Sequence, residues 1–169
     1  MKSLASKLLI CLLILFLSSC DRGGKKISGD VRIGSQAPAF SLKSINGKTM
    51  TNRSLEGNIV ILNFWATWCE PCKKEIPELK QLAANSEAKV VGIALDQDGL
   101  RAVKPFVEKN SINYTVLLGN EEVFNRFKGF GIPYTLVLDR KGKIVNIYRG
   151  PATKASLEQD LAKIRQDAY

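Results

Sequence analysis

Histidine is absent from this chain of 169 residues, and cysteine is scarce, with four residues. Without histidine, nucleophilic catalysis by a Cys–His or Ser–His pair is excluded. Most zinc sites are excluded too, because they need histidine or a larger set of cysteines close together. We therefore expect an activity that uses no metal and no other bound cofactor.

Long runs of one charge are missing as well, although the formal net charge is +9. The basic residues occur singly or in pairs such as Lys25-Lys26 and Lys73-Lys74, never five in a row. A nucleic-acid surface needs a denser basic patch or stripe. The pattern therefore predicts no nucleic-acid partner, and the excess positive charge fits a solvated surface beside anionic lipid.

No apolar run is long enough to span a membrane, which takes about 20 residues in a helix. The run from Leu8 to Leu17 has only ten residues, and the basic residues Lys2 and Lys7 precede it. This arrangement is typical of a secretory signal peptide. We therefore expect the mature protein outside the cytoplasm.

A cysteine follows the apolar run. Leu17-Ser18-Ser19-Cys20 resembles the bacterial lipobox, where cleavage precedes a cysteine that carries a diacylglyceryl group. We expect residues 1–19 to be a lipoprotein signal peptide and Cys20 to be the lipid attachment site. The alternative is an ordinary or uncleaved signal with an incidental cysteine. Asp21 resembles an inner-membrane retention signal, which favours the outer face of the cytoplasmic membrane.

The rest of the chain divides into a tether and one domain. Residues 20–34 are polar and rich in glycine and lysine, which predicts a lipidated flexible tether. Residues 35–169 suffice for one hydrophobic core. Cys11 leaves with the signal and Cys20 is acylated, so only Cys69 and Cys72 remain as free thiols. Two cysteines three positions apart cannot join distant parts of a fold, so we expect a catalytic pair.

Hydrophobic periodicity in this domain alternates between strands and helices. Ile59-Val60-Ile61-Leu62, within the segment 58–65, predicts a strand buried on both faces. Asn46-Gly47 indicates the turn of a hairpin over 40–51. We expect further strands over 89–95, 114–118, 134–139 and 143–148, and helices over 71–85, 99–110, 121–128 and 154–166. This order predicts an α/β sandwich with a mixed sheet.

Cys69 and Cys72 lie where the buried strand passes into the first helix. Unpaired amides and the helix dipole at that helix end lower the pKa of Cys69 below about 8.5. Their spacing puts Cys72 close enough to form a disulfide. We expect Cys69 to be the exposed attacking thiol and Cys72 the sheltered resolving thiol. Half of a zinc site has the same spacing, but the remaining ligands are missing.

A family resemblance extends from this pair. Asn63-Phe64-Trp65-Ala66-Thr67-Trp68-Cys69-Glu70-Pro71-Cys72 resembles the active-site strand and loop of the thioredoxin superfamily. With Lys73-Lys74-Glu75-Ile76-Pro77 it is similar to the TlpA-like and ResA-like membrane-anchored thiol-disulfide oxidoreductases. Gly131-Ile132-Pro133-Tyr134-Thr135 resembles that family's cis-proline loop. Over residues 35–164 the resemblance implies a thioredoxin-like three-layer sandwich with a mixed central sheet, an N-terminal hairpin extension and an inserted strand–helix segment.

The resemblance also implies roles for individual residues. Cys69 matches the nucleophile, Cys72 the resolving cysteine, and Pro133 a cis-proline that faces the disulfide. The backbone of Ile132 would then turn toward the site, where a client chain can pair with it as an added strand. A plain trans turn at Pro133 is the alternative reading.

Three further side chains are candidates for the site. Asn63 stands where related proteins carry a buried, proton-shuttling aspartate, and Glu75 is expected to take over that work as a general base. The alternative for Glu75 is a charged, solvated helix surface. Trp68 and Tyr134 are expected to contribute to client binding, whereas Glu70 is expected to be exposed.

The expected function is electron delivery to the disulfides of client proteins, with a membrane thiol reductant restoring the dithiol. The resemblance makes apocytochrome c thiols a leading client class, and we expect a monomer. A thiol peroxidase is one alternative, but Leu62 and Ala66 stand where peroxiredoxins carry proline and threonine. A copper metallochaperone is the other; its usual cysteine spacing and histidine are missing, although two thiolates can bind copper.

Overall fold

A five-stranded sheet forms the centre of the protein, and the computed structural model describes residues 30–166 of the chain. The spatial order of the strands is β5-β4-β3-β6-β7. β3 pairs in parallel with β4 and antiparallel with β6, which confirms the predicted mixed sheet. The strands are β3 (Val60–Trp65), β4 (Lys89–Ala94), β5 (Thr115–Leu118), β6 (Tyr134–Leu138) and β7 (Ile144–Arg149).

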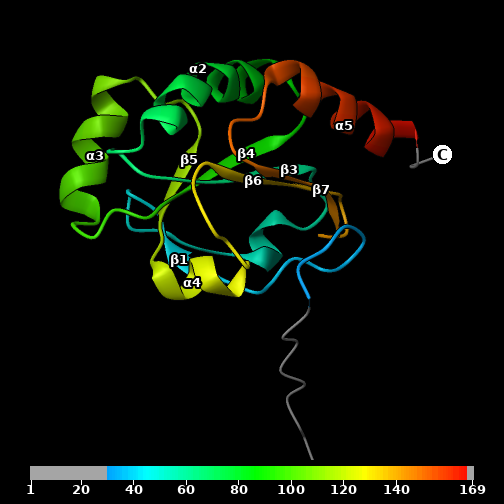
Figure 1. The fold of residues 1–169 in the computed structure, drawn as a ribbon, viewed down its shortest axis with the longest axis horizontal. Helices are drawn as coiled ribbons and strands as arrows, with labels where there is room; N and C mark the ends of the chain where they lie inside the picture. The colour runs from blue at the N-terminus through cyan, green and yellow to red at the C-terminus, as the bar shows by residue number, and fades with distance from the viewer. Residues whose placement is uncertain (1–29, 167–169) are drawn as a thin grey trace, which may run out of the picture.

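Helices cover both faces of the sheet, which confirms the three-layer sandwich (Figure 1). One face packs against α2 (Glu70–Asn85), α3 (Leu100–Lys109) and α5 (Lys154–Gln166). The other face packs against the 3-10 helix η1 (Asn52–Leu55), α4 (Glu121–Arg126) and the hairpin of β1 (Ser41–Lys43) and β2 (Thr49–Thr51). The predicted elements are therefore all present, with ends that differ by at most two residues.

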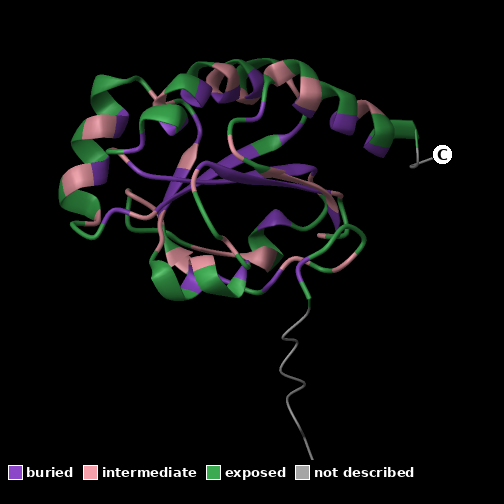
Figure 2. Cartoon of the chain, in the orientation of Figure 1, coloured by how far each residue is buried: buried purple, intermediate pink, exposed green. Residues whose placement is uncertain are grey.

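β3 is the middle strand of the sheet, and every one of its six residues is buried (Figure 2). Its side chains alternate between the two cores, as strand geometry requires. Ile61 and Trp65 join the core under α2 and α5, while Leu62 and Phe64 join the core above α4. The central position of β3 thus fixes where the loop after Trp65 leaves the sheet.

β5 and α4 form the strand–helix segment that precedes β6, and β5 occupies the edge of the sheet beside β4. The N-terminal hairpin reaches this edge, since the Ile45 N–H donates to the Val116 carbonyl oxygen at 3.0 Å. Ser44 also forms an isolated bridge with Leu117. The hairpin therefore covers backbone that would otherwise stay open at the edge of the sheet.

Packed structure begins earlier than the predicted domain start at Ser35. Val31 is 7% exposed, and the Gly34 N–H donates to the Ile144 carbonyl oxygen at 2.7 Å. The segment 31–34 thus belongs to the domain, because it contacts β7 and the core that packs against α4. The predicted signal peptide, Cys20 and most of the tether lie outside the described residues. Within residues 30–166, no helix has both the length and the apolar character to cross a membrane.

Candidate active site

Cys69 and Cys72 are joined by a disulfide at the first turn of α2, with an S–S distance of 2.05 Å. Cys69 is the residue that caps the helix, and its Sγ accepts the Cys72 N–H at 3.2 Å. Pro71 fits the first turn because an amide there has no helical partner. The predicted position of Cys69 at a helix N-terminus is confirmed, and the amide contact stabilises a thiolate on Cys69 after reduction.

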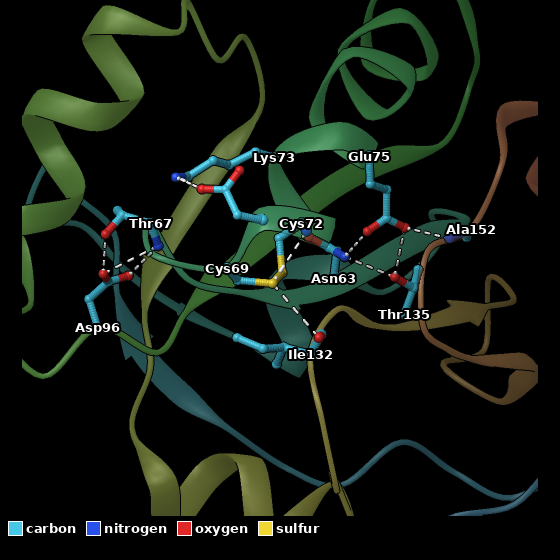
Figure 3. Close-up of a disulfide and its surroundings, with 11 residues drawn as sticks. Asn63, Thr67, Cys69, Cys72, Lys73, Glu75, Asp96, Ile132, Thr135 and Ala152 are labelled. Atoms are coloured by element: carbon cyan, nitrogen blue, oxygen red, sulfur yellow. Dashed lines mark hydrogen bonds and ion pairs between the residues drawn. A yellow bond between two sulfur atoms is a disulfide. The ribbon is translucent and has the colours of Figure 1, made fainter.

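Cys69 is less accessible than the sequence suggested. It is 5% exposed and Cys72 is 1% exposed, so the expectation of an exposed attacking cysteine is wrong for the disulfide form. The cause is the loop before β6: the Ile132 carbonyl oxygen lies 3.7 Å from Cys69 Sγ (Figure 3). Cys69 is nevertheless the more accessible of the two sulfur-bearing residues.

The peptide bond between Ile132 and Pro133 is cis, as the resemblance implied. Tyr134 is only 1% exposed, so little of its side chain is open to a client, although the residue lines a pocket beside Ile132. Its hydroxyl donates to the Phe127 carbonyl oxygen at 3.1 Å, and its ring lies 5.9 Å from that of Phe64. Tyr134 pairs with Phe64 across β6 and β3, so its side chain points into the same core as Phe64, on the α4 side of the sheet.

Glu75 is buried, at 3% exposed, so the alternative of a solvated surface position is wrong. Its Oε2 accepts a hydrogen bond from the side-chain amide of Asn63 at 3.1 Å. Its Oε1 accepts the Ala152 N–H at 3.0 Å and the Thr135 hydroxyl at 3.4 Å. Asn63 also donates to Thr135 at 2.9 Å, which closes a small buried network (Figure 3). The network fixes a carboxylate one helical turn after Cys72.

Burial raises the pKa of Glu75 from 4.5 to about 7. The hydrogen bonds from Ala152, Asn63 and Thr135 oppose this rise, and the charge of Glu78 adds to it. A carboxyl group with a pKa near neutrality can both accept and release a proton under ordinary conditions. Glu75 is therefore suited to general acid–base work beside the cysteine pair.

Asp96 holds the loop that carries the cysteines, a role that was not predicted. This 6% exposed carboxylate accepts the Thr67 N–H at 3.1 Å and the Thr67 hydroxyl at 2.5 Å (Figure 3). Trp68, which follows Thr67 in the chain, is 66% exposed and is accessible to a client. In residues 30–166, no group of three or more histidine, cysteine, aspartate or glutamate side chains could hold a metal ion.

Glu70, inside the Cys-X-X-Cys segment, is exposed as predicted. Its carboxylate lies 2.5 Å from the Lys73 ammonium group. The hydrogen bond and charge of Lys73 lower the pKa of Glu70. Glu70 and Glu75 thus flank Cys72 with opposite properties: the first stays ionised in solvent, while the second titrates near neutral pH inside the protein.

Residues 33–147 match the model of the AhpC/TSA family. The chain belongs to the AhpC/TSA family. It is 37% identical to the thiol-disulfide oxidoreductase ResA of Bacillus anthracis over 137 residues, 79% of each chain. It is 31% identical to ResA of Bacillus subtilis (strain 168) over 160 residues, covering 93% of this chain and 88% of that protein.

Solved structures agree with these relatives. A thiol:disulfide interchange protein of the thioredoxin family from Chlorobium tepidum TLS superposes with a TM-score of 0.68 and 33% identity. The match covers 80% of this chain and 99% of that one. With the Cys69–Cys72 disulfide, these likenesses identify the chain as a thiol-disulfide oxidoreductase that acts on disulfide-containing proteins.

Proposed function

We propose that this oxidoreductase reduces the disulfides of client proteins outside the cytoplasm. The observation that carries the proposal is the position of the Glu75 carboxyl group, which is 3% exposed and lies one helical turn after Cys72; its burial raises its pKa to about 7. A negative charge there disfavours thiolates on Cys69 and Cys72 and thereby favours the disulfide. Strongly oxidising members of this fold instead stabilise their reduced form, so this site favours giving electrons away.

The reaction begins with the reduced protein. The Cys69 thiolate attacks one sulfur of the client disulfide, which forms a Cys69–client bond and releases the other client sulfur as a thiolate. Glu75 takes the proton of Cys72, and the Cys72 thiolate then attacks Cys69 Sγ. The Cys69–Cys72 disulfide forms and the second client thiolate leaves. The client gains two electrons and, with two protons, becomes a dithiol.

The proposed location rests on the N-terminal sequence. Residues 1–19 would be removed as a lipoprotein signal peptide, Cys20 would carry the lipid, and the polar residues between Cys20 and the packed segment that begins at Val31 would tether the domain. Asp21 supports the outer face of the cytoplasmic membrane. Replacing Cys20 with alanine should move the protein from the membrane fraction to the soluble fraction. Retention in the membrane with an intact signal would contradict lipid attachment at Cys20.

Clients and the electron source follow from the resemblance. Apocytochrome c thiols are the proposed leading client class, and a membrane thiol reductant would restore the dithiol after each turn. The protein is proposed to act as a monomer, as the domain buries its own core.

Insulin reduction tests the proposed activity against the copper-chaperone alternative. The full chain should catalyse reduction of insulin disulfides by dithiothreitol, and the variant Cys69→Ser should not. A parallel copper titration of the reduced chain should show no tight one-to-one complex. Tight copper binding without insulin reduction would contradict the proposal and support a metallochaperone.

A further inference from the structure

We propose that a pocket beside the active-site disulfide, formed around Phe130, Ile132 and Arg149, binds an acidic side chain that flanks the client's cysteine. This inference rests on the proposed function, because it assumes that a client polypeptide lies across the Cys69–Cys72 site. It adds a chemical class to the client: an aspartate or glutamate near the disulfide.

Ile132 connects the pocket to the reactive sulfur of Cys69. Ile132 places its carbonyl oxygen 3.7 Å from Cys69 Sγ, and the same residue lines a cavity of about 260 Å³. The residues around this cavity are Phe130, Gly131, Ile132, Pro133, Tyr134, Arg149 and Gly150. A client segment that reaches Cys69 along this loop therefore brings a neighbouring side chain to the cavity.

Arg149 is held at the pocket by the backbone of the sheet. It pairs with Tyr134 across β6 and β7, and the Gly150 N–H donates to the Pro133 carbonyl oxygen at 2.9 Å. Directly opposed residues project from the same face of a sheet. The guanidinium group of Arg149 is thus attached to a rigid strand end.

The charge of Arg149 is unmatched by the protein itself. Within residues 30–166 it forms no salt bridge, and the lining residues of the pocket include no carboxylate. Five other arginines of the described chain each pair with a carboxylate: Arg32, Arg101, Arg126, Arg140 and Arg165. An arginine that stays unpaired beside a binding site offers a two-pronged donor for a carboxylate of another molecule.

Phe130 supplies the apolar part of the same pocket. It is 98% exposed, the largest exposure among the big apolar side chains of the described residues. A glutamate or aspartate side chain has a short apolar stem and a charged end, so it can contact Phe130 and reach Arg149. A lysine or arginine on the client would meet like charge at the same place.

The direction of the client chain makes the inference specific. A strand advances about 3.3 Å per residue, and a segment paired beside Ile132 has one direction only. One flank of the client cysteine therefore approaches Arg149 while the other flank runs away from it. An acidic residue should help on one side of the cysteine and not on the other.

The test uses the full chain in detergent, reduced beforehand and freed of reductant. It is mixed with synthetic peptides that contain one internal disulfide and carry Glu, Gln or Lys two positions before or after a cysteine. The rate constant of peptide reduction is measured after quenching with iodoacetamide. At one flank we expect Glu peptides to react about two- to fivefold faster than Gln peptides, the range of an exposed ion pair, and Lys peptides more slowly.

Variants at Arg149 identify the cause of the preference. Arg149→Gln should bring the Glu-to-Gln ratio to about one, Arg149→Lys should keep a preference for Glu, and Arg149→Glu should make the Lys peptide the faster one. Arg53→Gln is the matched control, because Arg53 is also exposed, forms no salt bridge in the described chain and lies in η1, before β3. It should leave every ratio unchanged.

An equal rate for Glu and Gln peptides at both flanks, or a Glu preference that survives Arg149→Gln, would overturn the proposed pocket. Failure to reduce any peptide would contradict the proposed direction of electron flow instead. In that case the oxidised chain is mixed with the dithiol peptides. The same dependence of the ratio on Arg149 would support the pocket there, and its absence would overturn it.

Discussion

The Glu75 carboxylate accepts the Asn63 side-chain amide at 3.1 Å inside the protein, where both residues are at most 3% exposed. The amide of Asn63 cannot accept a proton, so the carboxyl group is the member of this pair that titrates. The central strand thus orients the base, and the helix that carries Cys72 supplies it. This division of roles predicts separate effects on thiol acidity and on turnover.

Glu75→Gln should shift the reactivity of Cys69 to lower pH. The substitution removes a negative charge near the pair, so the Cys69 thiolate forms more readily. Turnover should fall by about a hundredfold or more, the low end of general-base contributions, because Cys72 loses its proton acceptor. The pH profile of iodoacetamide alkylation, measured beside the rate of client reduction, checks both effects.

Glu70→Gln is the control for this change, since it removes an equal charge from a solvent-exposed position in the first turn of the same helix. It should alter the alkylation profile and the rate only slightly, because solvent screens exposed charges. Equal effects of the two variants would mean that Glu75 acts only through its charge. An unchanged profile and full activity in Glu75→Gln would reject its role as base.

The stability of the oxidised protein should fall as pH rises from about 4.5 to 7. The folded-state pKa of Glu75 lies above its unfolded value, so the folded state binds the proton more tightly. The stabilisation is complete below pH 4.5 and is lost as pH passes through 7, by roughly 3 kcal/mol. Denaturant unfolding at several pH values, compared with Glu75→Gln, isolates this group. The difference in unfolding free energy between the two proteins should therefore vary with pH, and a constant difference would contradict the raised pKa.

Cys72→Ser should trap clients as mixed disulfides on Cys69, because the attack that resolves the intermediate is lost. Cys69→Ser should form no such adducts, as the attacking thiol is gone. Non-reducing electrophoresis followed by mass spectrometry checks the trapping and identifies the clients. Equal trapping by both variants would show that the two cysteines do not divide the work in this way. Recovery of apocytochromes c would support the proposed client class.

Asp96→Ala should destabilise the protein and slow client reduction. The Thr67 N–H and hydroxyl would lose their buried acceptor, at a cost of about 1–3 kcal/mol. The loop to Cys69 would also lose its anchor to β4. Asp98→Ala is the control, because Asp98 is exposed and pairs with Arg101 on the surface; it should change the unfolding free energy by about 0.5 kcal/mol or less. Identical behaviour of the two variants would contradict the positioning role of Asp96.

Much of the fold and the cysteine pair could be predicted because the signals are local. The apolar run before Trp65 marks a central strand, and the Cys-X-X-Cys spacing with Pro71 marks the start of a helix. The burial of the Tyr134 ring was not predicted, for a physical reason. Adjacency to Pro133 in sequence says nothing about which face of β6 the ring takes, and pairing with Phe64 turns it inward.

The partners of Glu75 could not be read from the sequence. Thr135 and Ala152 lie 60 and 77 positions away, and the packing of α5 brings Ala152 to the site. Asp96 is 29 positions from Thr67 and meets it only because β4 runs parallel to β3. One signal was present: Asn63 and Thr135 are polar residues within otherwise apolar strands, which marks a buried polar network.

The equilibrium reduction potential of the Cys69–Cys72 pair tests the central claim most directly. The full chain is equilibrated with dithiothreitol or glutathione buffers, and the fraction of disulfide is measured by alkylation. A protein that delivers electrons should have a strongly negative potential, near the value of about −270 mV found in thioredoxin. A value near about −120 mV, typical of the strongest oxidants with this fold, would contradict the account and make the protein a donor of disulfides.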